Sequence, residues 1–423
     1  MAAHKIVHAA DLHLDSPLLG LSRYDGAPVE RIRGATRRAL RNLVDLCIEE
    51  PAGALLIAGD LFDGDWQDYA TGLFFLAELG RLRDAGTQVI VLRGNHDAES
   101  RISKKLRHPD HVTVLDHRKP QTVELADLGV AVHGQSFATA AVSQNLALDY
   151  PPPVAGAVNI GLLHTALEGR EGHGRYAPCS ERELIDRGYD YWALGHVHRR
   201  EVLCQAPWIV FPGNLQGRHA RETGPKGATL ITIEDGRVTA VEPRTLDGVR
   251  WACLDVDATP LATADAVVQA VHEQLRSAAE QAEERLLAAR VVVRGRSAAH
   301  AAFSHDPERW VSEIRAAAFD VPADVWIEKV RFDSRLPLDI DALRGQDDAI
   351  AALLGTLDAA RHDPAQQAEL RACLADVLRK LPSDVKRAPE LAALDGGPGW
   401  AALLDEVEQQ LVGALLEPGE PTS

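Results

Sequence analysis

Side chains able to bind metal ions follow several short apolar runs of this sequence, and Gly94-Asn95-His96-Asp97 is the plainest example. This stretch comes directly after Val89-Ile90-Val91-Leu92, a run that predicts a buried strand. A tight turn, an amide oxygen, an imidazole and a carboxylate are then expected together at the end of a strand. Ligands of open α/β sheets bind beyond the carboxyl ends of the strands. The stretch therefore predicts a binding or catalytic site.

Four other predicted strands end in residues of the same kind. The residues that follow the apolar segments at 5–10, 53–58, 158–163 and 191–194 are, in order, Asp11 and His13, Asp60 and Asp63, His164, and His196 and His198. In extended backbone, residues i and i+2 point to the same side, so the pairs Asp11 with His13 and His196 with His198 can each bind one ion. Any one of these residues alone would fit a polar loop, but five such segments in one chain indicate a shared site.

The chemistry of the combined set points to divalent cations. It mixes carboxylates, imidazoles and an amide with no thiolate, which suits Mn²⁺, Fe²⁺ or Zn²⁺. Seven ligands are too many for one catalytic ion that keeps an open position, and they suit two ions roughly 4 Å apart that share a carboxylate. The predicted metal ligands are Asp11, His13, Asp60, Asn95, His164, His196 and His198.

The same residues carry a resemblance to a known family. Asp11-x-His13, Gly59-Asp60-x-x-Asp63, Gly94-Asn95-His96-Asp97, His164 and Gly195-His196-x-His198 resemble the five motifs of the calcineurin-like metallophosphoesterase superfamily. Residues 10–17 and the segment Pro212–Arg218 are similar to bacterial SbcD-type DNA-repair exonucleases, in particular to their YhaO-like branch. The resemblance covers about residues 4–245, and the rest of the chain is matched by its layout alone.

The resemblance implies a fold, an activity and a role for each site residue. The fold would be a four-layer αββα sandwich, and the activity a 3′-to-5′ exonuclease with single-strand endonuclease activity, most often with Mn²⁺. His96 would be the catalytic imidazole and Asp63 would orient it. One ion would be bound by Asp11, His13 and His198, the other by Asn95, His164 and His196, with Asp60 as the bridge.

The order of predicted elements indicates an α/β protein with three parts. Strands alternate with helices from residue 5 to about 97, which is typical of βαβ units. A β-α-β-α-β pattern over residues 251–332 predicts a small α+β domain, and the pattern becomes helical from Leu336. We therefore expect a phosphoesterase domain at 1–247, a capping or DNA-binding domain at 248–335 and a helical region at 336–423.

Charge bears on the substrate. The net charge is −17, with 28 Lys and Arg against 32 Asp and Glu in residues 1–250, so the remainder carries −13. A free-standing DNA-binding protein is usually basic, so local patches must supply any contact with DNA. The candidate contacts are Arg101, Lys104, Lys105 and Arg107, which follow the Gly94–Asp97 stretch, together with Arg218. A solvated helix turn would explain the first four equally well.

Other features of the sequence bear on location. No run of eighteen apolar residues predicts a membrane span, and the N-terminus lacks the pattern of a signal peptide. Five scattered cysteines without a CxxC motif favour a reducing compartment. We therefore expect a cytoplasmic protein that does not bind membranes.

Two other functions and two protein partners stay open at this point. The same metal centre would serve a phosphodiesterase that acts on cyclic nucleotides or dinucleotide polyphosphates, and the acidic charge favours that alternative. A non-catalytic scaffold is the third reading, although the full ligand set and His96 argue against it. The apolar stripes at 336–423 suggest docking of an ABC/SMC-type ATPase, or packing of these helices on one another. A homodimer is a further expectation, and DNA is the expected substrate.

Overall fold

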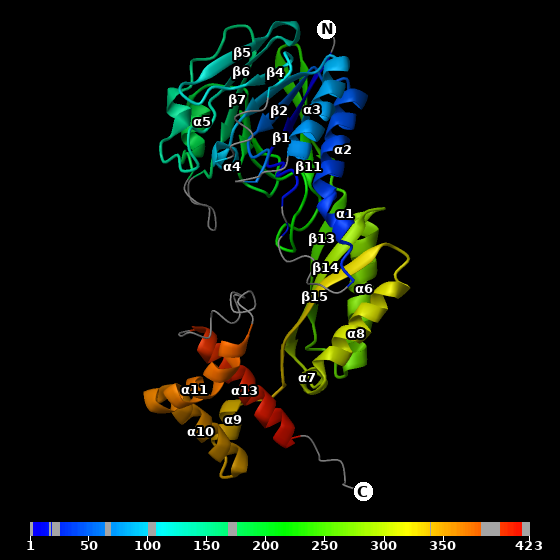
Figure 1. Ribbon diagram of the computed structural model, residues 1–423, viewed down its shortest axis with the longest axis vertical. Coiled ribbons are helices and arrows are strands. Elements are labelled where there is room, and N and C mark those ends of the chain that lie inside the picture. Colours follow the sequence, from blue (N-terminus) through cyan, green and yellow to red (C-terminus); the bar gives the residue numbers. More distant parts are fainter. Residues whose placement is uncertain are drawn as a thin grey trace. The chain divides into compact units, whose positions relative to one another are not determined.

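A computed structural model describes residues 3–16, 18, 26–63, 69–99, 107–167, 176–338, 340–381 and 398–416 (Figure 1). These residues form two compact units. The first is drawn from Met1–Cys253, Ser277–Arg290 and Ala323–Glu328, and the second from Leu254–Arg276, Val291–Pro322 and Lys329–Ser423. The domain boundaries expected at 247 and 335 stay a prediction. No helix in the described part of the chain has the length and apolar character that crossing a membrane requires.

Two six-stranded sheets form the centre of the first unit. One has the order β12-β11-β1-β2-β3-β4, in which β1 to β4 are mutually parallel. The other has the order β5-β6-β7-β8-β10-β9, in which β6, β7, β8 and β10 are parallel. The strands of the first sheet are β1 (His4–Ala9), β2 (Ala54–Ala58), β3 (Gln88–Leu92), β4 (Val112–Val114), β11 (Gly227–Glu234) and β12 (Arg237–Thr245). Those of the second are β5 (Gln121–Leu125), β6 (Val130–Gly134), β7 (Val158–His164), β8 (Tyr191–Gly195), β9 (Glu201–Gln205) and β10 (Trp208–Phe211).

The alternation of side chains along β2 explains the layering. Leu55 and Ile57 pack on one face of the first sheet, in a core that also contains Leu43 and Leu82 of the covering helices. Leu56, one residue away, points to the other face and packs with the inner residues of the second sheet. A third core covers the outer face of the second sheet. The order helix, sheet, sheet, helix confirms the predicted αββα sandwich.

Short helices complete the two outer layers. The helices of this unit are α1 (Val29–Arg33), α2 (Ala35–Glu49), α3 (Tyr69–Asp84), α4 (Asn95–Glu99) and α5 (Glu181–Asp186), with 3₁₀ turns η2 (Ala126–Leu128) and η3 (Leu146–Asp149). In Figure 1, α2 and α3 lie on one side of the sheets and α5 on the other. Helix α5 begins with a capping box, in which Ser180 and Glu183 each accept a hydrogen bond from the other's backbone N–H.

A third sheet begins in the first unit and continues into the second. Its order is β13-β14-β15, and its helices alternate with the strands as the sequence predicts. Trp251 and Trp326, near the starts of β13 and β15, pack edge to face and share a core with Ile32 of α1. The elements are β13 (Val249–Asp257), α6 (Ala264–Ala282), β14 (Leu286–Arg296), α7 (Ala299–His305), α8 (Pro307–Ala317), η4 (Ala318–Asp320) and β15 (Val325–Arg335).

The rest of the second unit is helical, as expected. Asp363 accepts a hydrogen bond from the backbone N–H of Ala365 and so begins a helix with Pro364 in its first turn. The helices are α9 (Ile340–Arg344), α10 (Ala349–His362), α11 (Pro364–Lys380) and α13 (Pro398–Leu416). Among the elements that the sequence did not predict are β9 and α7.

Candidate metal centre

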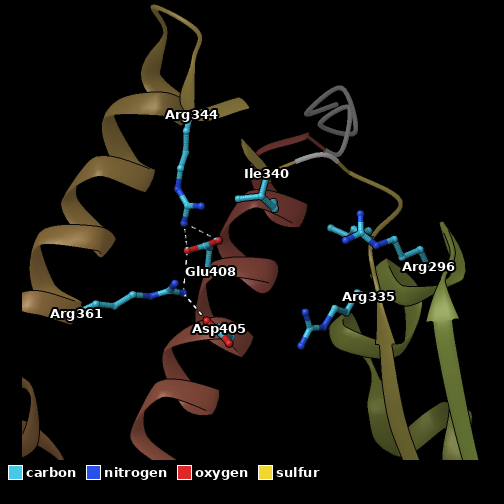
Figure 2. A pocket seen from close by; sticks show the side chains of 8 residues that line it. Arg296, Arg335, Ile340, Arg344, Arg361, Asp405 and Glu408 are labelled. Carbon is cyan, nitrogen blue, oxygen red and sulfur yellow. Dashed lines mark hydrogen bonds and ion pairs between the residues drawn. The ribbon is translucent and has the colours of Figure 1, made fainter. Parts of the chain in front are cut away.

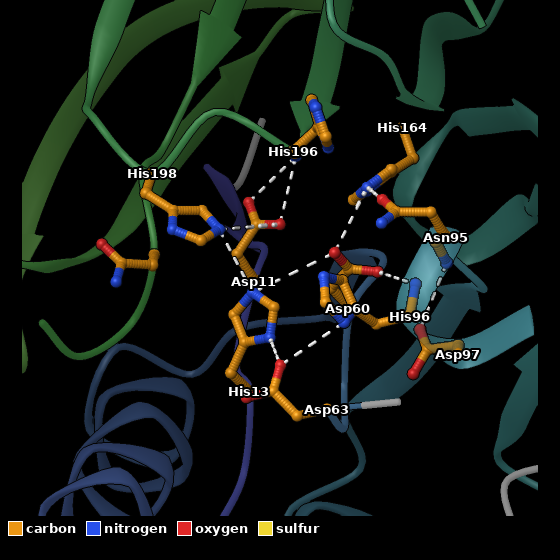
Figure 3. Close-up of polar contacts among 12 residues, drawn as sticks. Asp11, His13, Asp60, Asp63, Asn95, His96, Asp97, His164, His196 and His198 are labelled. Carbon is orange, nitrogen blue, oxygen red and sulfur yellow. Dashed lines mark hydrogen bonds and ion pairs between the residues drawn. The ribbon is translucent and has the colours of Figure 1, made fainter. Parts of the chain in front are cut away.

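The predicted ligands meet at the carboxyl ends of five strands (Figure 3). Strands β1, β2 and β3 of the first sheet are parallel, as are β7 and β8 of the second, so the ends of each group lie at one edge of its sheet. In Figure 3 the side chains from both edges point toward a common centre. The structure brings together all seven predicted ligands, Asp11, His13, Asp60, Asn95, His164, His196 and His198, with Asp63 and His96 beside them.

The backbone at four of these residues is strained. Asp11, His13 and Asp60 have φ of 52°, 41° and 52°, and His196 has φ of 97°. Residues with a side chain rarely adopt this left-handed region, and such strain persists where the surrounding structure holds it. Here the loops after β1 and β2 run side by side, with Asp11 N–H donating to Gly59 O at 3.0 Å and His13 N–H to Asp60 O at 3.0 Å. The strain therefore turns several short side chains toward one point.

Two motif glycines permit the close approach of the strand ends. A Cβ on Gly94 would lie 2.3 Å from Asp60 Oδ1, and one on Gly195 would lie 1.9 Å from the carbonyl oxygen of Ala58. Neither contact is sterically possible, so any side chain at these positions would push the ligands apart. This explains why a glycine precedes Asn95 and His196 in the sequence.

The first group of donor atoms comes from Asp11, His13 and His198. Their nearest donor atoms all lie within 4.8 Å of one another. His13 Nε2 is 3.1 Å from His198 Nε2, and His198 Nε2 is 3.9 Å from Asp11 Oδ1. The carboxylate of Asp11 is oriented by the backbone N–H of His196, which donates to it at 3.0 Å.

The second group consists of Asp60, His164 and His196, with Asn95 next to it. His164 Nε2 lies 3.5 Å from Asp60 Oδ2 and 2.9 Å from Asn95 Oδ1. The same Oδ2 of Asp60 is 4.0 Å from His13 Nε2 in the first group. Asp60 therefore lies between the two groups, and its other oxygen accepts a hydrogen bond from His96 N–H at 3.0 Å.

Three imidazoles present an unprotonated nitrogen to the centre. The Nδ1 atoms of His13, His164 and His198 lie against oxygens of Asp63 at 2.5 Å, Ala58 at 2.8 Å and Glu222 at 2.7 Å. Because those oxygens are acceptors, Nδ1 carries the proton in each ring and Nε2 keeps its lone pair. Two such lone pairs, on His13 and His198, then face each other at 3.1 Å. A cation between them removes the repulsion, so the donor set fits a metal ion.

The buried carboxylates support the same conclusion. Burial and the neighbouring charge of Asp60 raise the pKa of Asp11 well above its ordinary value, and burial raises the pKa of Asp60 to about 7. Burial lowers the pKa of His13 to about 3 and that of His164 to about 4, so these rings are neutral at pH 7. Neutral imidazoles cannot balance two buried carboxylates, whereas divalent cations can.

His96 differs from the predicted ligands in its exposure. Its side chain is 41% exposed, while those of His13 and His164 are 1% and 0% exposed. The family resemblance implies that Asp63 orients His96, but Asp63 Oδ1 is 3.6 Å from His96 Nδ1 and only 2.5 Å from His13 Nδ1. In this structure Asp63 accepts a hydrogen bond from His13, and its contact with His96 is longer than a hydrogen bond.

Sequence reasoning missed Glu222, which lies behind His198. The Glu222 carboxylate accepts hydrogen bonds from His198 Nδ1 at 2.7 Å, Asn214 Nδ2 at 3.0 Å and the backbone N–H of Arg218 at 2.7 Å. Burial opposes ionisation of Glu222, but the hydrogen bond from His198 and the Arg218 guanidinium hold its pKa well below the usual range. The one available signal was its position four residues after Arg218.

Asp97 was part of the opening motif but received no predicted role. It is fully buried and accepts hydrogen bonds from the backbone N–H groups of Leu61 at 3.0 Å, Phe62 at 3.2 Å and Gly94 at 3.2 Å. Asp97 thus joins the loop after β2 to the loop after β3. Burial and the charge of Asp60 raise its pKa to about 7.

The predicted substrate contacts are only partly placed. Arg101, Lys104 and Lys105 lie outside the described residues, and Arg107 is exposed at the start of the next described segment. Arg218 lies beside the centre, with Nη1 3.3 Å from Asp63 Oδ2 and Nη2 3.1 Å from Glu222 Oε1. Its side chain is 15% exposed. It is therefore positioned by two carboxylates, one of which, that of Asp63, also lies 3.6 Å from His96 Nδ1.

Comparison with known families agrees with this geometry. Residues 4–200 match the calcineurin-like phosphoesterase family, and residues 251–335 match the middle domain of metallophosphoesterase YhaO. The chain therefore contains a calcineurin-like phosphoesterase domain, of a family of hydrolases that use a dimetal centre, followed by a YhaO-type middle domain.

Individual relatives cover part of the chain. Metallophosphoesterase YhaO of Bacillus subtilis is 35% identical over 271 residues, which is 63% of this chain and 66% of that protein. The DNA double-strand break repair protein Mre11 of Methanopyrus kandleri is 24% identical and covers 55% of this chain and 51% of its own length. A component of the nuclease SbcCD from Rhodobacter capsulatus is 33% identical over 100 residues, 23% of this chain and 22% of its own. The first two matches span about half to two thirds of those relatives.

Proposed function

We propose that this protein is a metal-dependent DNA nuclease, with 3′-to-5′ exonuclease and single-strand endonuclease activity, that acts in DNA repair. One observation carries the proposal. The Nε2 lone pairs of His13, His164 and His198 point toward the buried carboxylates of Asp11 and Asp60. The named activities of the Mre11 and SbcCD relatives support DNA as the substrate.

The two donor groups would hold one divalent ion each. Asp11, His13 and His198 would bind the first and Asn95, His164 and His196 the second, with Asp60 shared. When bound, such ions neutralise the anionic oxygens of a phosphodiester and activate a water for attack on phosphorus. Nitrogen and oxygen ligands without sulfur favour Mn²⁺, with Fe²⁺ or Zn²⁺ as alternatives.

His96 would deliver a proton to the leaving oxygen. Its partial exposure lets it contact a substrate that the buried imidazoles cannot reach, and its ring packs edge to face on that of His13 at 5.1 Å. A proton donor stabilises the 3′-oxygen as its bond to phosphorus breaks. Asp63, at 3.6 Å from His96 Nδ1, would help to orient the His96 ring.

Arginines and lysines would bind the phosphates of the DNA substrate. Arg218 is held by Asp63 and Glu222 and is oriented toward the centre, which suits a single phosphate group next to the reacting one. We assign the approach of the longer strand to Arg101, Lys104, Lys105 and Arg107, because they follow directly after the motif that contains His96.

Partners of the nuclease are part of the proposal. The helices after residue 336 would dock an ABC/SMC-type ATPase, and a second copy of the chain would form a homodimer. The proposed location is the cytoplasm. Deletion of residues 336–423 should abolish capture of the ATPase in a pull-down while leaving the phosphoesterase activity, and an undiminished complex would refute the docking site.

Turnover on matched substrates tests the proposal. The purified chain with Mn²⁺ should hydrolyse single-stranded DNA, and it should hydrolyse bis-p-nitrophenyl phosphate through the same centre. Hydrolysis of bis-p-nitrophenyl phosphate and cyclic nucleotides without cleavage of DNA would instead establish the small-molecule phosphodiesterase that the net charge of −17 favours. No hydrolysis of any of them would establish a scaffold.

A further inference from the structure

A second charged site lies in the other compact unit, where no metal ligands were predicted. A cavity of about 230 Å³ is lined by two aliphatic side chains and six charged ones (Figure 2). In Figure 2, arginines from the ends of two strands face it on one side and helices enclose it on the other. The charged residues are Arg296, Arg335, Arg344, Arg361, Asp405 and Glu408.

The charges on the helical side neutralise one another. Glu408 is buried and lies 3.0 Å from Arg344 Nη2 and 2.8 Å from Arg361 Nη2. Arg361 also lies 2.8 Å from Asp405 Oδ1. Arg344 has a further partner in Asp358, at 3.0 Å. These ion pairs join α9, α10 and α13. The charges on the helical side of the cavity therefore hold these helices together.

The arginines on the strand side are different. Arg296 ends β14 and Arg335 ends β15, and these ends are joined because Ser297 N–H donates to the Arg335 carbonyl at 2.9 Å. Arg296 Nη1 donates to the carbonyl oxygen of Leu338 at 3.3 Å. Within the described ranges, neither guanidinium forms an ion pair with a carboxylate.

Neighbouring arginines on the same strands do form ion pairs with carboxylates. Arg294 of β14 pairs with Asp255 at 2.9 Å, and Arg331 of β15 pairs with Asp333 at 3.1 Å. By contrast, Arg296 and Arg335, which line the cavity from the strand side, lack a carboxylate partner within the part of the chain that the structure describes. The cavity therefore holds two positive charges in excess, in a region of the sequence whose overall balance is −13.

We propose that this cavity binds a phosphate group through Arg296 and Arg335. A planar guanidinium donates two parallel hydrogen bonds to phosphate oxygens, and two guanidiniums from adjacent strand ends can grip one group from two sides. The aliphatic side chains of Leu336 and Ile340 line the same cavity. The phosphate belongs either to the backbone of a nucleic acid strand or to a free nucleotide or polyphosphate.

The test compares the Arg296→Gln/Arg335→Gln double variant with the natural chain. The matched control is Arg331→Gln, which removes an arginine of β15 that does not line the cavity. Binding of pyrophosphate and of a single-stranded oligothymidylate is measured calorimetrically in a chelator, which removes the contribution of the metal centre and prevents cleavage. Circular dichroism checks the fold, and each single variant is measured as well, so that a misfolded double variant does not decide the result.

The double variant should bind at least one of the two probes at least tenfold more weakly than the natural chain does. The affinities of the control variant should stay within twofold of those of the natural chain. Each lost contact to a single strand should lower the slope of log K against log salt by about 0.7. If the affinity for both probes falls, a free phosphate compound is a sufficient ligand. If only the affinity for the oligonucleotide falls, the ligand is the phosphate backbone of a nucleic acid strand. Equal binding by the natural chain and the double variant, or no binding by either, overturns the proposal.

The oligonucleotide arm rests on the proposed nuclease function, while the pyrophosphate arm does not. Turnover of bis-p-nitrophenyl phosphate with Mn²⁺ should be the same in all variants, because these arginines are not ligands or acid groups of the metal centre. A chain that binds pyrophosphate but cleaves no DNA would thus refute the nuclease and keep the phosphate site.

Discussion

The metal centre and the arginine cavity recognise charge with different kinds of side chain. At the metal centre, short carboxylates and imidazoles are buried, and backbone N–H groups or second carboxylates fix their direction. At the cavity, long arginines leave the exposed ends of β14 and β15 and are fixed by little more than one carbonyl. A metal centre demands ligand atoms in a defined geometry, whereas a phosphate accepts hydrogen bonds from many directions. The comparison predicts that substitutions at the first site should have much larger effects.

Loss of the shared carboxylate should have the largest effect. Asp60→Ala removes the group that lies between both donor sets, at 3.5 Å from His164 and 4.0 Å from His13. Metal content measured by mass spectrometry should fall below one ion per chain, and turnover of bis-p-nitrophenyl phosphate should fall by about 10³-fold or more. Retention of two ions per chain would contradict the placement of Asp60.

Substitution of His96 should separate chemistry from metal binding. His96→Asn leaves every predicted ligand in place, so metal content should stay at two ions per chain while turnover of DNA falls by about 10²- to 10⁴-fold. The pH dependence of turnover should also lose the branch that reports the acid. Turnover at the natural rate in the metal-loaded variant would exclude the proposed role.

Glu222 should have an intermediate effect through His198. Glu222→Gln keeps the shape but removes the charge that holds the proton on His198 Nδ1 at 2.7 Å. Affinity for one of the two ions should fall by about 10- to 100-fold, measured by competition with a chelator. Glu242→Gln is the control, because that carboxylate pairs with Arg244 on exposed β12. Equal affinities in both variants would reduce Glu222 to a structural residue.

The smallest expected effect concerns a histidine that no site uses. His8 is buried between the sheets, 3.0 Å from the Tyr191 hydroxyl, and burial lowers its pKa from 6.5 to about 3. At a pH between these two pKa values, His8 is protonated in the unfolded chain and neutral in the folded chain. The free energy of unfolding should therefore fall as pH decreases below about 6.5. The contribution is at most about 1.4 kcal/mol per pH unit.

Urea unfolding in a chelator, from pH 7.5 to 5, measures this slope. His8→Gln should reduce it, and substitution of exposed His117 should leave it unchanged. The same slope in His8→Gln and the natural chain would show that another buried group dominates the loss of stability in acid.

The sequence predicted the site better than its surroundings, for a physical reason. Each ligand follows an apolar run, and parallel strands bring their carboxyl ends to one edge, so Asp11, Asp60 and Asn95 could be grouped without coordinates. Glu222 could not be found in this way, because it follows no predicted strand and reaches His198 through a loop. Asp97 was visible in its motif, but its hydrogen bonds go to backbone groups that no pattern reveals.

The arginine cavity was also invisible to the sequence. Arg296, Arg335, Arg344 and Arg361 are spread over more than sixty residues of an acidic region, so their proximity depends on how β14, β15 and the helices pack. Charge counted along the chain predicted no basic site there. The strand β9 was missed as well, since its apolar run has only three residues, Val202-Leu203-Cys204, and none of its residues is fully buried.

The contact between Gly195 and the Ala58 carbonyl has a consequence for design. It joins an end of one sheet to an end of the other, and the two donor groups draw on both sheets. The distance between the ligands that the two sheets contribute to each group then depends on the thickness of the hydrophobic layer between the sheets. Bulkier or smaller residues in that layer, far from any ligand, should shift the preference between ions of different radius.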